Sequence, residues 1–115
     1  MAFTEIEKRR HERDLERFLE RRRPPPHIRP ELDIGYRIAG HSVEIFEIRP
    51  DWQHPEEKRE HPLAKATFVR TKNCWRVFWM RRDLKWHGYE PNPEVRSLAA
   101  FLAVVDHDEY CCFFG

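Results

Sequence analysis

The N-terminal residues place apolar side chains on one helix face and charged side chains on the others. The apolar stripe is narrow and consists of Phe3, Leu15, Phe18 and Leu19. Thr4 and Glu7 have the spacing of a capping box, in which each side chain binds a free backbone amide of the other residue. Prolines at 24–26 must end the helix, because proline cannot continue its hydrogen bonds. The pattern predicts a charged helix over 4–23 and a Pro-rich link over 24–30.

Between residues 31 and 90 the apolar period falls to two, which is the period of a β-strand. Short turns separate most of these segments, so neighbouring strands should pair as antiparallel hairpins. The predicted strands cover 32–38, 43–49, 64–70, 74–81 and 85–89. Residues 50–62 are polar and contain prolines, which predicts a long surface loop before the third strand.

The C-terminal quarter returns to helical spacing. Asn92-Pro93-Glu94 combines a capping side chain, a first-turn proline and an acid at the positive end of the dipole. Apolar residues then recur at helical intervals, which predicts a deeply buried helix over 92–106. The apolar tail at 107–115 must pack, either on its own chain or across a dimer. Consecutive strands between two terminal helices predict an α+β fold with an antiparallel sheet of about five strands.

Composition narrows the class of protein. The chain has 115 residues, enough for one domain, and its 21 Lys+Arg nearly balance 20 Asp+Glu, which excludes a polybasic coat or an acidic tail. The first residues lead into a charged stretch, unlike a secretory signal, and the longest apolar run is too short to cross a bilayer. The number of cysteines is three, an odd number that does not suit a set of disulfides. These features predict a reduced, cytoplasmic protein with no membrane partner.

Charge is unevenly distributed, and the segment 70–90 carries six basic residues against two acidic ones. Cations interleaved with tryptophan are what a single-stranded nucleic-acid platform requires, since cations hold phosphates and aromatic rings stack on bases. A β-strand of the hydrophobic core shows the same alternation, so the competing interpretation is that these aromatic side chains pack in the core. The predicted binding residues are Arg70, Lys72, Arg76, Arg81, Arg82, Lys85, Trp86 and His87. Of these, Arg81, Arg82 and Lys85 are expected to be the exposed anion contacts.

A second hypothesis concerns the first hairpin, where Asp33 is followed by Glu47-x-Arg49. Metal-dependent nucleases use two carboxylates to hold Mg²⁺ and a cation to stabilise charge on phosphate. A two-residue turn pairs Ile38 with Val43 and puts Asp33 and Glu47 on opposite faces, whereas a three-residue turn spoils the hydrophobic match. A structural pair between Glu47 and an arginine is the alternative.

Metal ligation and cysteine chemistry have weaker support. The ligand-type residues near the C-terminus are His87, Asp106, His107, Asp108, Cys111 and Cys112, without Cys-x-x-Cys or His-x-x-x-His spacing. Neither Cys111 nor Cys112 has an identifiable base nearby in sequence. We therefore predict no metal and no cofactor.

Several strings in this chain are distinctive: 46–50, 63–67, Trp79-Met80-Arg81-Arg82-Asp83-Leu84-Lys85-Trp86-His87, and the closing Cys112-Phe113-Phe114-Gly115. With them the sequence resembles a family of small bacterial proteins known only as a domain of unknown function. The resemblance implies a stand-alone cytoplasmic domain and no assigned catalytic residues. The expected architecture is also similar to the p32-like one, whose members are oligomers. We expect a non-enzymatic binding or scaffold domain, either a homo-oligomer (a dimer first) or a binder of nucleic acid or another anion.

Overall fold

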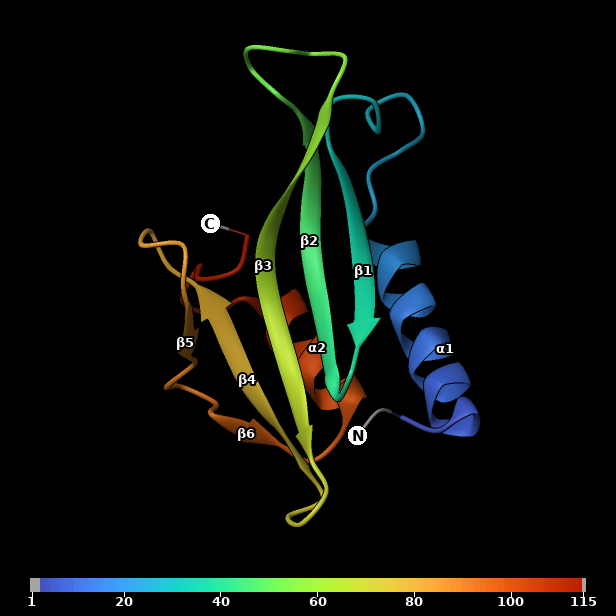
Figure 1. Cartoon of the computed structure of the whole chain (residues 1–115), viewed down its shortest axis with the longest axis vertical. Helices are drawn as coiled ribbons and strands as arrows, with labels where there is room; N and C mark the ends of the chain where they lie inside the picture. Colours follow the sequence, from blue (N-terminus) through green and yellow to red (C-terminus); the bar gives the residue numbers. More distant parts are fainter. Residues whose placement is uncertain (1–2, 115) are drawn as a thin grey trace.

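The computed structural model describes residues 3–114 and folds them into one antiparallel sheet with two helices against one face (Figure 1). The elements are α1 (Glu5–Arg22), β1 (Asp33–Ala39), β2 (Ser42–Pro50), β3 (Lys58–Val69), β4 (Cys74–Met80), β5 (Trp86–Gly88), β6 (Glu94–Val95) and α2 (Leu98–His107). The strand order is β1-β2-β3-β4-β5, and β6 also pairs with β4. The predicted α+β class and antiparallel sheet are confirmed. Met1, Ala2 and Gly115, the last residue of the predicted tail, lie outside the described residues.

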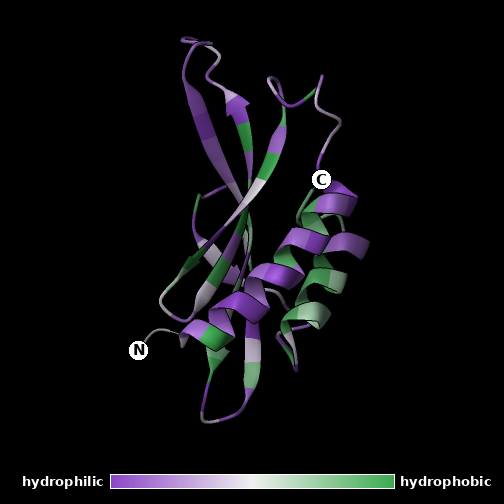
Figure 2. Cartoon of the chain, turned by 90° about the vertical axis from the view of Figure 1, so that its right-hand side faces the viewer, coloured by the Kyte–Doolittle hydropathy of each residue, from purple (hydrophilic) through white to green (hydrophobic). Residues whose placement is uncertain are grey.

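Helix α1 begins as the capping box predicts. The Glu7 amide donates to the Thr4 hydroxyl over 3.2 Å, and the Thr4 amide donates to the Glu7 carboxylate over 2.9 Å. Only Leu15 and Phe18 are buried in this helix, whereas α2 buries Leu98, Phe101, Leu102 and Val105. Figure 2 shows the same contrast, with α1 mostly hydrophilic and α2 largely hydrophobic. Helix α2 is therefore the more deeply buried, as predicted.

The core lies between the two helices and one face of the sheet. Its sheet side includes Val43 and Ile45 of β2 and Ala64 and Ala66 of β3, all fully buried. Alternation along the strands directs their neighbours to the opposite face, which neither helix of residues 3–114 covers. We call this uncovered side the open face.

The predicted loop at 50–62 was too long. Strand β2 continues to Pro50 and β3 already begins at Lys58, so the connection is only 51–57. Residues 58–62 pair with the end of β2, but all five are exposed. The alternation that identifies a half-buried strand is therefore missing, although the backbone pairs.

The predicted helix at 92–106 was wrong over its first six residues. Glu94 and Val95 form β6 beside β4, and α2 begins only after Ser97, whose hydroxyl accepts the Ala100 amide at 3.0 Å. The Val77 amide donates to the Pro93 carbonyl over 3.0 Å. An Asn-Pro-Glu sequence suits a turn as well as a helix start, and pairing with β4 selects the extended form.

The apolar tail packs on its own chain. Phe113 is buried and its ring centroid lies 4.8 Å from that of Tyr89. The Asp108 carboxylate accepts the backbone amides of Phe113 and Phe114 at 3.0 and 2.9 Å. The Arg22 guanidinium lies 4.0 Å from the centroid of the Phe114 ring. Of the two packing modes predicted for the tail, the intramolecular one is observed.

Candidate functional site

The basic residues of 70–90 separate into a neutralised group and an unpaired group. Arg70 donates two hydrogen bonds to Glu7, at 2.8 and 3.2 Å, and the Lys72 ammonium lies 3.7 Å from Glu94. Hydrogen bonds from Arg70 and the Thr4 amide lower the pKa of Glu7 to about 2. The first two predicted contact residues therefore face carboxylates, and Arg70 ties α1 to the end of β3.

Arg81, Arg82 and Lys85 occupy the turn between β4 and β5, and all three are exposed. Within residues 3–114, none of them has a carboxylate oxygen within 4.0 Å. Asp83 lies in the same turn but is engaged by its own hairpin: it accepts the Lys85 amide at 3.0 Å and contacts His87 at 2.8 Å. The hydrogen bond with His87 lowers the pKa of Asp83. Three cations thus project from one hairpin, and within residues 3–114 none of them forms an ion pair within 4.0 Å, although Asp83 shares their turn.

The turn itself is closed in an unusual way. The Leu84 amide donates to the Arg81 carbonyl at 2.9 Å, and the Arg81 amide donates to the Lys85 carbonyl at 3.3 Å. Leu84 has φ +60°, in the left-handed region that favours glycine, and its side chain is 81% exposed. The hairpin therefore ends in an exposed apolar tip between cations.

The tryptophans of the segment have different roles. Trp75 is only 3% exposed and packs against Phe3, His11 and Phe68, so it belongs to the core. Trp79 and Trp86 are half-buried. In the register, Trp79 faces His87 and Trp86 faces Met80, so the two rings lie on opposite sides of the hairpin.

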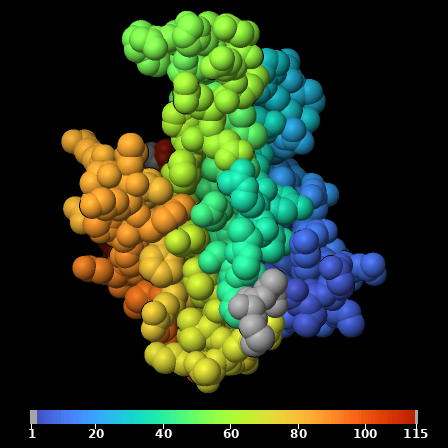
Figure 3. Space-filling model, viewed as in Figure 1, coloured from blue at the N-terminus to red at the C-terminus, as the bar shows by residue number. Residues whose placement is uncertain are grey.

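Trp86 lies on the open face, where the sequence analysis missed one participant. The Lys65 ammonium is 5.0 Å from the Trp86 ring centroid and 5.1 Å from that of Phe78. Arg76 is exposed on the same face, opposite Thr67. Figure 3 shows this face, with the hairpin in orange along its left edge. Lys65 belongs to a different strand, and only the β3–β4 register could have signalled it.

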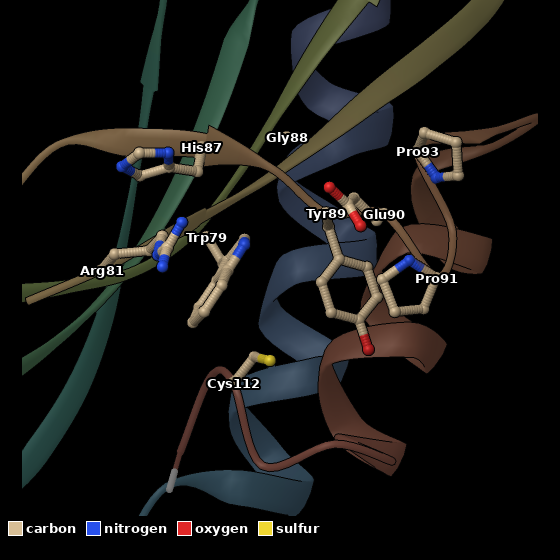
Figure 4. Close-up of a pocket in the computed structure, with 9 residues that line it drawn as sticks. All are labelled: Trp79, Arg81, His87, Gly88, Tyr89, Glu90, Pro91, Pro93 and Cys112. Carbon is tan, nitrogen blue, oxygen red and sulfur yellow. The ribbon is translucent and has the colours of Figure 1, made fainter.

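Trp79 lies beside a cavity of about 510 Å³ between the hairpin and the C-terminal tail (Figure 4). Its walls are Trp79, Arg81, His87, Gly88, Tyr89, Glu90, Pro91, Pro93 and Cys112. The Arg81 guanidinium is 5.5 Å from the Trp79 ring centroid. A second cavity, of about 550 Å³, shares Trp79 and Arg81 but is otherwise lined by Met80, Arg82 and Asp83. The structure therefore brings Arg81 and His87 to one cavity. Trp79, Tyr89 and Glu90 were not among the predicted binding residues, and Cys112 was considered only for metal ligation and thiol chemistry.

The hypothetical nuclease residues are not brought together. Asp33 pairs with Ile48 and Ile34 pairs with Glu47, so the two carboxylates lie on opposite faces of the hairpin. Arg23 binds Asp33 through two hydrogen bonds, at 2.7 and 2.8 Å, and lowers the pKa of that carboxyl. Arg49 lies 3.2 Å from Glu47. This arrangement matches the structural pair rather than a shared Mg²⁺ site.

Within residues 3–114, no three His, Cys, Asp or Glu side chains converge to hold a metal. Asp106 instead faces Arg21 and Arg22 at 3.6 and 3.5 Å, and Asp108 holds the tail. Burial and the nearby Asp108 raise the pKa of the Cys112 thiol. A raised pKa disfavours the thiolate that nucleophilic chemistry requires.

Comparison with known proteins bears on the family alone. The model of one family, described as a domain of unknown function (DUF3024), matches residues 3–115. No curated protein and no solved structure matches the chain. Neither of the described helices is long and apolar enough to span a membrane.

Proposed function

Since the chain belongs to the family described as a domain of unknown function (DUF3024), its activity has to be inferred from its surface, and we propose that it binds single-stranded nucleic acid. The contact is the cationic hairpin, which we define as Arg81, Arg82 and Lys85 with the flanking Trp79 and Trp86. The proposed role is binding without catalysis, in the cytoplasm.

The observation that carries this proposal is the segregation of charge. Arg70 and Lys72 are neutralised by carboxylates, while the three cations of the hairpin have no carboxylate within 4.0 Å among residues 3–114. Unpaired cations on a short turn repel one another, so an anionic partner that lies across them is stabilised by all three. Lys65 and Arg76 extend the positive surface along the open face.

The aromatic rings favour a single strand over a duplex. Trp79 and Trp86 flank the hairpin on its two sides and are each half-buried, which leaves part of each ring available. Bases of a single strand can turn outward and stack on such rings, whereas paired bases in a duplex cannot. Leu84 at the tip adds an apolar contact.

The test is fluorescence anisotropy of a labelled single-stranded oligonucleotide across a salt series. Replacing Arg81, Arg82 and Lys85 by alanine removes up to three phosphate contacts. Because the slope of log K against log salt is roughly 0.7 per phosphate for single strands, it should fall in magnitude by about 2.

A matched control removes three positive charges elsewhere. Arg9, Arg13 and Arg17 of α1 are exposed, and among residues 3–114 none has a carboxylate within 4.0 Å. Alanine at these positions suits a helix, and the salt slope should remain that of the wild type. Absence of binding at low salt, or an equal loss in the α1 variant, overturns the proposal.

The homo-oligomer expected from the sequence stays a prediction. Phe113 is buried within its own chain, so the tail does not require a second copy. Sedimentation velocity at several concentrations distinguishes a monomer from a dimer. In a dimer, two cationic hairpins could bind the same nucleic-acid strand, and this bivalent binding would raise the apparent affinity.

A further inference from the structure

We propose that the cavity beside Trp79 is a subsite for one nucleotide unit, with the base against the Trp79 ring and the phosphate at Arg81. The inference rests on the proposed function and names the ligand chemistry at one part of the same surface. It concerns the cavity of Figure 4 and not the open face that carries Trp86.

Size and shape match this ligand class. A cavity of about 510 Å³ falls in the roughly 300–1,000 Å³ range of small-molecule sites. Its walls include the half-buried ring of Trp79 and the exposed side chains of Pro91 and Pro93. Tyr89 is only 1% exposed, so it supports the wall from behind and offers no free ring face. An aromatic wall favours a planar ring, which can stack on it while its polar edge faces the charged rim.

The charges at the rim give the site a direction. Arg81 and His87 lie together on one side of the cavity, and the exposed Glu90 carboxylate lies apart from them, next to Tyr89 (Figure 4). A phosphate is attracted by the Arg81 guanidinium and repelled by Glu90, so it must lie on the Arg81 side. A carboxylate accepts hydrogen bonds only, and Glu90 therefore favours a base that offers an amino group.

The walls are held in place by contacts outside the cavity. Tyr89 is 1% exposed, packs against the tilted ring of Phe113, and its amide donates to the Val77 carbonyl at 2.9 Å. Asp83 holds the His87 ring at 2.8 Å. A preformed pocket loses little entropy when its ligand enters.

The composition of its walls favours this cavity over its neighbour. The second cavity is lined by the Asp83 carboxylate and has one aromatic wall, Trp79. It lacks the Pro91 and Pro93 side chains of the first cavity, whose lining does not include Asp83 although that carboxylate contacts His87 from outside.

The experiment compares an adenine-containing oligonucleotide with a strand of the same length that has sugar and phosphate but no bases. Wild-type protein should bind the base-bearing strand about 5- to 150-fold more tightly, as one stacked base requires. Trp79→Leu keeps an apolar side chain but removes the stacking face, and it should lose most of this preference. Trp52→Leu removes a tryptophan that is 85% exposed and lies outside the cationic hairpin, and it should leave the preference unchanged.

The outcomes separate this inference from the proposed function. If no strand binds, both fail. If the two strands bind equally and binding still depends on Arg81, Arg82 and Lys85, only the nucleotide subsite fails. Retention of the full base preference in Trp79→Leu also overturns the subsite.

A free nucleotide tests the cavity without relying on that variant. Adenosine monophosphate should displace the labelled strand from wild-type protein, and Arg81→Gln should weaken this competition by about tenfold. No displacement overturns the subsite. If adenosine monophosphate binds more tightly than the labelled strand, the cavity is a nucleotide site but its ligand is a free nucleotide. That result would overturn the proposal that the protein binds single-stranded nucleic acid.

Discussion

Replacement of Leu84 by glycine is predicted to stabilise the protein. Leu84 has φ +60°, where its Cβ crowds the following carbonyl oxygen, and no glycine is present to relieve the turn. Its side chain is 81% exposed, so truncation removes little buried apolar surface. The hydrogen bonds that close the turn come from backbone atoms of Arg81, Leu84 and Lys85 and survive the substitution.

The size of the effect follows from two opposing contributions. Releasing an L-residue from the left-handed region gains about 1–2 kcal/mol. Glycine gives back about 0.5–1 kcal/mol, because the unfolded chain becomes more flexible. The net gain in the free energy of unfolding should be about 0.5–1 kcal/mol, or roughly 2–5 °C in melting temperature for a domain of this length.

Thermal and urea unfolding followed by circular dichroism would measure this gain. Asn73→Gly is the control: Asn73 also has positive φ, at 49°, but asparagine tolerates that conformation. Its substitution should change the melting temperature by less than half as much. If Leu84→Gly were neutral or destabilising, or matched Asn73→Gly, the claim of strain at the hairpin tip would be refuted.

Two further predictions concern the elements that hold the ends of the chain. Because the folded-state pKa of Glu7 is about 2 and its ordinary value is 4.5, the Glu7 carboxylate stabilises the fold fully above pH 4.5, and this contribution is lost as pH falls toward 2. In Glu7→Gln the melting temperature, measured by circular dichroism, should fall less over that window. Glu5→Gln should keep the wild-type slope. Phe113→Ala should cost about 3–5 kcal/mol in urea unfolding, independent of protein concentration. A cost below about 1 kcal/mol, or one that varies with concentration, would contradict intramolecular packing of the tail.

The sequence predicted an element correctly wherever all the residues that determine its conformation lie in one short stretch of the chain. The Thr4–Glu7 capping box and the prolines after Arg23 delimit α1 within about a turn of sequence. The two-residue turn that pairs Ile38 with Val43 follows from the alternation of β1 and β2, and it also predicts that Asp33 and Glu47 lie on opposite faces.

Prediction failed where a partner strand, not the local pattern, selects the conformation. Residues 58–62 are exposed on a β-ladder that extends past the core, so no apolar alternation marks them. Glu94 and Val95 carry helix-start chemistry next to an edge of β4 that can accept a strand. The backbone hydrogen bonds gained there outweigh a modest local helix preference.

At the candidate site, residue types alone identify 70–90 as the basic and aromatic segment, because net charge and residue type are properties of the chain. Which of those charges remain available for a ligand depends on how the chain folds. Arg70 meets Glu7 across 63 residues of sequence, and Trp75 enters the core while Trp79 borders a cavity with Cys112 of the tail. The physical reason is that neutralisation and burial depend on distances in space, and folding sets these between residues far apart in the chain.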